Sequence, residues 1–158
     1  MIKFDPPSVT YKKPVSDTWL KRFLAAVASV VGGNVTVHSG DRDFVPQGGS
    51  RTSQHLLGRA ADLKVSGHTP KQVFDCLLAA AEGLPAPMLA RYQILYHGTH
   101  TCTEAEHVHV GRYAFLDKRS KRAGFDFWIE GTTQETTKKY KCVKSVDKGE
   151  GFASDLTI

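Results

Sequence analysis

The chain has 158 residues, of which 41% are hydrophobic and 23% are charged, and its formal net charge is +5 at pH 7. This length and composition predict one globular domain that buries roughly 70% of its unfolded surface. No apolar run approaches the roughly 20 residues that cross a bilayer, so we expect no membrane span. The first seven residues carry an acid and two prolines where a signal peptide needs an apolar segment, so we expect no signal peptide.

The positive charge favours an anionic partner, which could be nucleic acid, a membrane surface or an acidic cell-wall polymer. A basic surface can also serve solubility alone. Two features argue against nucleic acid: Trp19 and Trp128 do not lie in basic-aromatic runs, and no Gly-rich phosphate loop follows a predicted strand. Three cysteines without C-x-x-C spacing also argue against a cysteine-built zinc knuckle. We therefore expect no nucleic-acid partner.

The N-terminal third predicts an extended arm followed by a helix. Residues 1–15 are rich in proline, which opposes helix. Ser16 or Asp17 can cap a helix that continues to the pair Gly32-Gly33. Apolar side chains recur in it at helical spacing, namely Leu20, Phe23, Leu24, Val27, Val30 and Val31. We expect this helix to pack on the core.

The middle of the chain alternates short apolar runs with polar or helical segments. Residues 39–54 predict a long irregular loop, of a kind that is often functional. Thr69-Pro70 begins a second helix that should reach about Glu82. Short β-branched or apolar runs predict strands over residues 34–38, 59–65, 93–96 and 107–110.

After Gly111 the pattern weakens. Residues 125–129 predict an edge strand or a docking segment, and residues 131–158, rich in Thr, Lys and Gly, predict a β-ribbon or an ordered tail. The chain therefore divides into an N-terminal arm over residues 1–15, one domain over residues 16–116 and a peripheral C-terminal extension over residues 117–158.

Two motifs supply the side chains of a metal site. The run Ser53–Asp62 reads SQHLLGRAAD and places an imidazole seven residues before a carboxylate. In the predicted strand over residues 107–110, His107 and His109 share one face, and Glu106 adds a spare carboxylate. Each motif alone has a structural explanation, since most H-x-H pairs are surface or core histidines and Asp62 could cap a helix. Together they contain the ligand types of a hydrolytic zinc site.

The run Ser53–Asp62 matches the pattern S-x-H-x-x-G-x-A-x-D at every fixed position, and by it the chain resembles the peptidase M15 family. Glu106–His109 resembles the second motif of the carboxypeptidase branch, an acid followed by H-x-H. That family comprises D-alanyl-D-alanine carboxypeptidases and dipeptidases and phage L-alanyl-D-glutamate endolysins, and the hedgehog signalling domain shares its fold. The resemblance covers about residues 16–116. It implies an α+β, hedgehog/D,D-peptidase-like fold, with a small antiparallel sheet, two main helices and a zinc site on the sheet.

The resemblance also implies roles for the residues of the two motifs. His55, Asp62 and His109 correspond to the zinc ligands. Glu106 corresponds to the general base that activates water. His107 corresponds to a histidine beside the ligands that can steady the oxyanion.

Two further positions correspond to substrate-binding residues. Ser39–Arg42 resembles the family's S-G-x-R segment, in which the arginine, here Arg42, faces the substrate carbonyl or carboxylate. Ser53 corresponds to a substrate-binding hydroxyl. The chain has Asp41 where the family often has an aromatic residue, so the substrate pocket can differ.

The identity of the base has an alternative. Ideal pleating would place Glu106 opposite His107 and His109, so the strand must bend or begin after Glu106. Glu104 is the other candidate base.

These features predict a zinc-dependent peptidase that hydrolyses peptidoglycan stem peptides, as a D,D-carboxypeptidase or as an endopeptidase. A positive chain suits an anionic wall, and the lack of a signal peptide suggests a phage protein that acts in the periplasm or cell wall or is carried on the virion. The alternative is a structural or binding component of the virion tail with little or no turnover. In either case residues 117–158 could contact other virion proteins.

Overall fold

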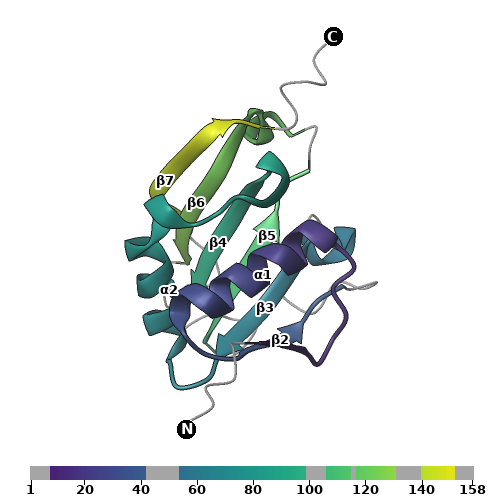
Figure 1. The fold of residues 1–158 in the computed structure, drawn as a ribbon, viewed down its shortest axis with the longest axis vertical. Coiled ribbons are helices and arrows are strands. Elements are labelled where there is room, and N and C mark those ends of the chain that lie inside the picture. Colours follow the sequence, from purple (N-terminus) through teal and green to yellow (C-terminus); the bar gives the residue numbers. More distant parts are fainter. Residues whose placement is uncertain (1–7, 42–53, 99–105, 115–116, 131–139, 152–158) are drawn as a thin grey trace, which may run out of the picture.

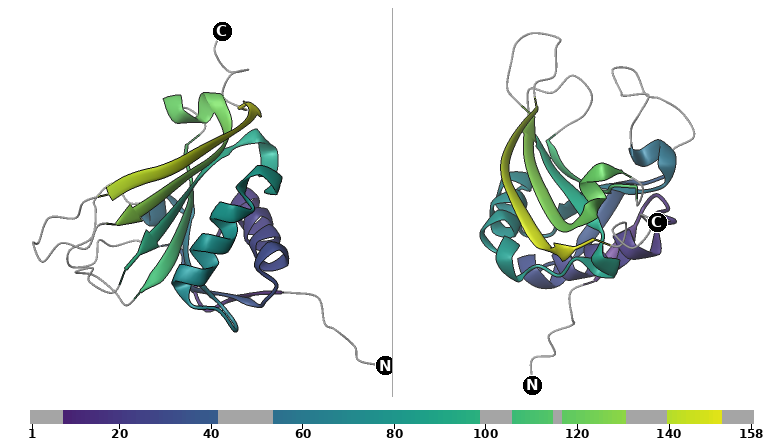
Figure 2. Two further views of the ribbon diagram at one scale, coloured as in Figure 1. Left: turned by 90° about the vertical axis from the view of Figure 1, so that its left-hand side faces the viewer. Right: turned by 90° about the horizontal axis from the view of Figure 1, so that it is seen from above.

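In the computed structural model, residues 8–41, 54–98, 106–114, 117–130 and 140–151 are described. They contain one seven-stranded sheet in the order β1-β2-β3-β5-β4-β6-β7. Two α-helices cover one face of this sheet (Figure 1), and the views in Figure 2 show both on the same side. None of the described helices is long and apolar enough to cross a membrane.

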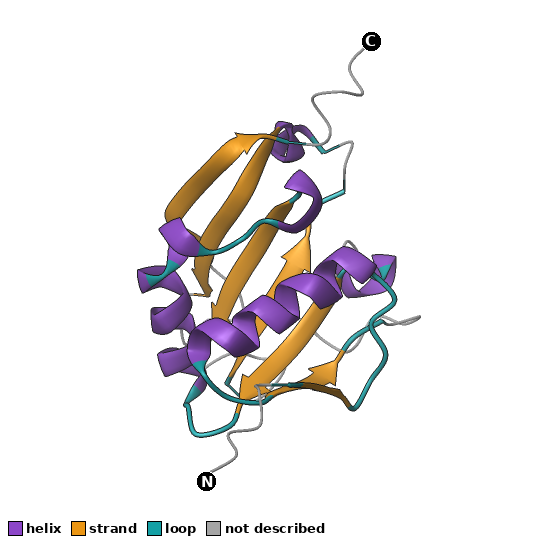
Figure 3. Cartoon of the chain, in the orientation of Figure 1, coloured by secondary structure: helices purple, strands orange, loops and turns teal. Residues whose placement is uncertain are grey.

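Figure 3 distinguishes the helices, strands and loops of the described chain. The helices are α1 (Thr18–Val31) and α2 (Pro70–Ala79). The strands are β1 (Val9–Tyr11), β2 (Val35–Ser39), β3 (Ala60–Val65), β4 (Arg91–His97), β5 (His107–Arg112), β6 (Arg122–Glu130) and β7 (Tyr140–Glu150). Short 3-10 turns are η1 (Gln54–Leu57), η2 (Ala81–Gly83), η3 (Pro87–Leu89) and η4 (Lys118–Lys121).

Helix α1 begins and ends where the sequence predicts. The side chain of Asp17 accepts a hydrogen bond from the Leu20 amide at 2.9 Å, and the helix ends at Gly32. The other carboxylate oxygen of Asp17 accepts from Arg112 Nε at 2.7 Å, so the helix start is tied to the end of β5. Most of the predicted apolar stripe is buried, namely Leu20, Phe23, Leu24, Val27 and Val31, and Val30 is partly buried against the core.

Helix α2 has the predicted start and a shorter body than predicted. Thr69 and Gln72 form a reciprocal capping box, and Pro70 occupies the first turn. The helix stops at Ala79 instead of Glu82, because the chain tightens there into the 3-10 turn η2. Val73, Phe74 and Leu77 are its buried residues.

The sheet is larger and more mixed than the predicted small antiparallel sheet. The four predicted strands are confirmed as β2, β3, β4 and β5. Both ends of the described chain add strands to them, and β1 and β6 lie parallel to their neighbours β2 and β4. The architecture is therefore α+β, as predicted, with a mixed sheet.

Strand β6 lies in the interior of the sheet, so the expectation of an edge strand or docking segment over residues 125–129 is wrong. It pairs with β4 on one side and with β7 on the other. Phe125 and Phe127 belong to the hydrophobic core, and the Phe125 ring lies 5.3 Å from that of Phe23 in α1. Core packing thus continues past the predicted boundary at residue 117.

Candidate metal centre

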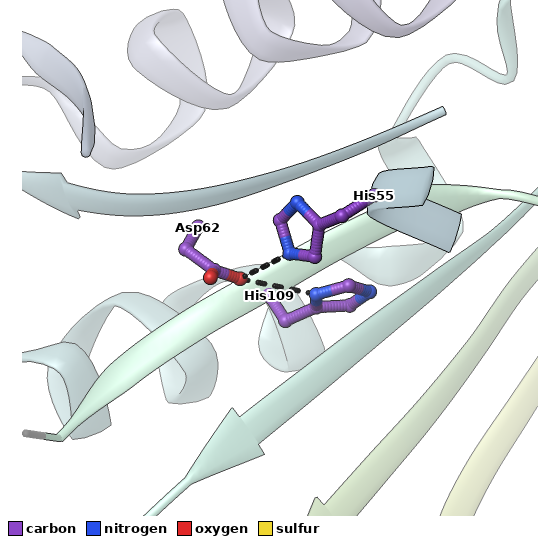
Figure 4. Close-up of side chains that lie close together, drawn as sticks. All are labelled: His55, Asp62 and His109. Atoms are coloured by element: carbon purple, nitrogen blue, oxygen red, sulfur yellow. Dashed lines mark hydrogen bonds and ion pairs between the residues drawn. The ribbon is translucent and has the colours of Figure 1, made fainter. Parts of the chain in front are cut away.

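The three predicted ligands meet on the face of the sheet opposite the helices. His55 comes from η1, Asp62 from β3 and His109 from β5. One ligand atom from each lies within 4.8 Å of the other two, and all three residues are buried. Figure 4 shows both imidazoles directed at the same carboxylate oxygen. The group could hold a metal ion.

The pairing of β3 with β5 places two of these side chains. Asp62 lies directly opposite His109 in the antiparallel register, so both side chains project from one face at neighbouring positions. Ala61 and Leu63, which flank Asp62 on β3, face the core. His55 approaches from η1 because the chain reverses at Gly58, whose φ of +70° favours glycine.

Each imidazole uses one ring nitrogen for Asp62 and the other for an oxygen outside the group. His55 Nε2 lies 3.1 Å from Asp62 Oδ1, and His55 Nδ1 lies 2.7 Å from the Gly40 carbonyl oxygen. His109 Nδ1 lies 3.1 Å from Asp62 Oδ1, and His109 Nε2 lies 3.1 Å from Gln54 Oε1. A neutral ring has one N–H and donates it either to Asp62 or outward. The form that donates outward leaves a lone pair on the inner nitrogen, which is the form that binds a metal.

Two pKa shifts agree with this arrangement. Burial alone would raise the pKa of Asp62, but the hydrogen bonds from His109 and His55 outweigh it and hold that pKa well below 3.8. Burial lowers the pKa of His109 below 6.5, although the hydrogen bond to Asp62 opposes this shift. Near neutral pH the carboxylate is therefore ionised and His109 is neutral, as metal binding requires.

Further polar side chains border the three ligand candidates. His107 lies on β5 near His109, and its Nε2 is 3.6 Å from Asp62 Oδ1. The His107 ring stacks on that of His97 in β4, with centroids 4.4 Å apart. His97 Nδ1 donates to Glu130 Oε2 of β6. The sequence predicted a place near the site for His107, but not for His97 or Glu130.

Glu106 immediately precedes β5, so the strand begins after it. Its Oε1 accepts a hydrogen bond from the Tyr96 hydroxyl at 2.9 Å. The Tyr96 ring lies 5.9 Å from Phe74 of α2, so this contact is on the helix side of the sheet. Burial, with a contribution from Glu106, raises the pKa of Tyr96 to about 12, which keeps the hydroxyl a donor. The role of Glu106 as base stays a prediction.

The predicted residues Arg42 and Ser53 and the alternative base Glu104 lie outside the described residues. The described part of the S-G-x-R segment has another role, because the Gly40 carbonyl holds His55. Asp41 accepts a hydrogen bond from the Ser16 amide at 3.1 Å, which fixes the chain before α1.

Sequence reasoning missed Gln54, which occupies a variable position of the first motif. Its side chain crosses β5 at Gly111, where a Cβ atom would lie only 1.8 Å from Gln54 Oε1. The glycine therefore leaves the space through which Gln54 reaches His109. The available signal in the sequence was that Gln54, which has an amide side chain, directly precedes the predicted ligand His55.

The family model described as Peptidase M15 matches residues 9–85. This range contains His55 and Asp62 and ends before His109, which the fold brings to them. No curated protein and no solved structure matches the chain. Through this match, with His55 and Asp62 inside the matched range and His109 beside them in the fold, the chain is similar to the peptidase M15 family.

Proposed function

We propose that this chain is a zinc-dependent peptidase that hydrolyses peptidoglycan stem peptides. The observation that carries the proposal is the convergence of His55, Asp62 and His109 within 4.8 Å, in a chain similar to a peptidase family. Two imidazoles and one carboxylate form a donor set of catalytic zinc sites, which keep a fourth position open. Peptidases of the M15 family are generally zinc-dependent.

The roles of the surrounding residues follow from their chemistry. Zinc supplies Lewis acidity and can bring the pKa of water to about 7. Glu106 is the proposed base, which accepts a proton from the attacking water and passes it to the leaving amine. This role requires its carboxylate to leave the Tyr96 hydroxyl on the helix side of the sheet and turn to the face that carries the ligands. His107, 3.6 Å from Asp62, is proposed to donate to the oxyanion. Arg42 and Ser53 are proposed to bind the substrate, because a guanidinium keeps its charge and pairs with a carboxylate.

The substrate proposal rests on charge and on the family resemblance. A net charge of +5 favours association with an anionic wall polymer. Members of the family that the motifs resemble cleave wall peptides, either as D,D-carboxypeptidases or as phage endolysins. We therefore propose a phage lysin or a virion-associated peptidase that acts in the periplasm or cell wall.

Digestion of purified peptidoglycan, followed by mass spectrometry of the muropeptides, tests the proposal. We expect the zinc-loaded protein to release D-alanine or new stem-peptide fragments, and the products identify the bond that is cut. Glu106→Gln should abolish product formation and leave bound zinc unchanged. Glu82→Gln is the matched control, because the Glu82 side chain is 78% exposed beside Lys144, and it should be fully active.

Two outcomes contradict the proposal. Zinc-loaded protein that binds peptidoglycan without releasing any product would instead be a binding component of the virion. Full activity of Glu106→Gln would remove Glu106 from the mechanism and leave Glu104 as the candidate base.

A further inference from the structure

We infer that His97 and Glu130 are positioning residues that hold the imidazole of His107 in place beside the metal centre. This inference rests on the proposed function, because it assigns these two residues to the same site. It brings β6, which lies beyond the family match, into the catalytic machinery.

A continuous line of contacts crosses four neighbouring strands of the sheet. It begins at Asp62 on β3, whose Oδ1 lies 3.6 Å from His107 Nε2 on β5. The His107 ring stacks on His97 of β4, with an interplanar angle of 20°. His97 Nδ1 then donates to the carboxylate of Glu130 on β6.

The strand registers build this line into the sheet. His97 lies directly opposite His107 in the β4–β5 pairing, so their rings are neighbours on one face. In the parallel β4–β6 pairing, Tyr96 lies opposite Ile129, so the next residue, Glu130, follows beside His97. The far end of the line is closed by Tyr140 of β7, which lies opposite Glu130 and whose ring contacts His97 edge-on.

Burial explains why Glu130 needs a partner such as His97. The residue is only 3% exposed, and a buried carboxylate is costly unless it is paired. The bond to His97 supplies such a partner and restricts the orientation of the His97 ring, because Nδ1 must point at the carboxylate. The His97 ring, oriented in this way, stacks on the His107 ring and restricts its rotation. This contact keeps His107 Nε2 near Asp62. Partners of this outer kind orient the residues of metal sites.

Glu130→Ala tests the inference, with kcat and KM measured separately on peptidoglycan peptides. We expect kcat to fall by about 10–100-fold, the usual effect of losing an outer partner. KM and zinc content should stay within twofold of the parent, because Glu130 is proposed to contact neither substrate nor metal. Glu130→Gln keeps an acceptor for His97 Nδ1, so its loss of kcat should be smaller. Glu150→Gln on β7 is the exposed control and should match the parent.

Ring-nitrogen NMR of the metal-free protein, labelled with 15N in histidine, gives a readout independent of activity. Glu130→Ala should shift the ring signals of both His97 and His107, whereas Glu150→Gln should shift neither. Should Glu130→Ala not fold, Glu130→Gln carries the same test, with smaller shifts expected at both rings.

Unshifted His107 signals in folded Glu130 variants, or a kcat within twofold of the parent in Glu130→Ala, overturn the inference. If the zinc-loaded parent hydrolyses nothing, the proposed function fails by itself. In that case the NMR spectra still decide whether Glu130 sets the orientation of His107.

Discussion

His55 and His109 approach Asp62 with different ring nitrogens, Nε2 in the first and Nδ1 in the second. The outer nitrogen of each ring has its own acceptor, the Gly40 carbonyl or the Gln54 amide oxygen. Both rings are therefore oriented before any metal binds. A preorganised site loses little side-chain entropy on binding, so metal affinity should depend on these outer acceptors as well as on the ligands.

Substitution of a ligand should remove both zinc and the stability that zinc confers. We expect His55→Ala and Asp62→Ala to bind far less zinc than the parent by elemental analysis. Zinc at a hundredfold excess over its Kd stabilises a protein by about 2.7 kcal/mol, or roughly 5–11 °C in Tm for a chain of this size. Calorimetry should show this shift for the parent and not for the variants.

The control for the ligand variants is His38→Ala, since His38 is an exposed residue of β2. It should keep the full zinc-dependent shift in Tm. Parent-like zinc content in both ligand variants would refute the assignment of the site.

Gln54→Leu should weaken zinc binding without removing a ligand. The substitution deletes the acceptor of His109 Nε2. Without this acceptor, the ring form with an N–H on Nε2 and a lone pair on Nδ1 is no longer favoured. We expect the zinc Kd, measured by competition with a chromogenic chelator, to rise by about 10–100-fold. Gln54→Glu retains an acceptor oxygen and should bind zinc more tightly than Gln54→Leu; the reverse order would contradict the role assigned to Gln54.

Strand β5 accommodates Gln54 only because residue 111 has no side chain. Gly111→Ala should displace the flexible end of Gln54, since the added Cβ would lie 1.8 Å from Oε1. We expect zinc affinity to fall as in Gln54→Leu, with little change in the unfolding midpoint of the metal-free protein. The double variant should lose no more affinity than either single variant, because both remove one contact. Additive losses in this cycle would show that Gly111 acts in another way.

The elements that carry the ligands could be predicted because their patterns are local. The alternation of Ala61 and Leu63 with Asp62 defines β3, and the spacing of His107 and His109 defines the open face of β5. The contact between Gln54 and His109 could not be predicted, because it depends on how η1 lies over β5. The contact between Glu130 and His97 could not be predicted either. The two residues are 33 positions apart in the sequence, and the parallel pairing of β4 with β6 leaves no local sequence pattern.

The whole sheet assembles the site from segments that are far apart in the chain. The family match ends at residue 85, whereas His109 and Glu130 follow it on β5 and β6. Residues 117–158 were predicted as a peripheral extension, yet β6 pairs directly with β4. The amphipathic helices and the central strands were predictable from periodicity, but the order of the strands was not, because it is decided by long-range packing.

A buried ionic network fastens the C-terminal strands to the rest of the molecule. Arg91 of β4 binds Asp126 of β6 through two hydrogen bonds, of 2.9 and 2.6 Å. Arg91 also donates to Asp147 of β7 at 2.8 Å, and Ser145 of β7 donates to Asp126 at 2.7 Å. The guanidinium of Arg91 therefore links three adjacent strands, β4, β6 and β7. Loss of one buried partner should weaken the whole molecule, because the remaining charge stays buried.

We expect Asp126→Asn to destabilise the protein at neutral pH and to matter less in acid. Burial opposes ionisation of Asp126, but Arg91 and Ser145 outweigh it and lower its pKa below 3.8. A carboxyl group with a lowered folded-state pKa stabilises the fold above its unfolded pKa, and this stability is lost as pH falls through the folded value. Removing a buried partner costs about 3–5 kcal/mol, and we expect the lower end at pH 7 because Arg91 retains Asp147.

Urea unfolding of the parent and of Asp126→Asn at several pH values between 7 and 2 measures this difference. It should stay constant down to roughly pH 4 and shrink below it, because only the parent has this carboxylate to protonate. Asp75→Asn is the control: Asp75 is 53% exposed and pairs with Lys71 one helical turn away, so its loss should cost about 0.5 kcal/mol or less. A difference for Asp126→Asn that persists unchanged in acid would mean that packing, and not the charge on Asp126, holds β6 and β7 to β4.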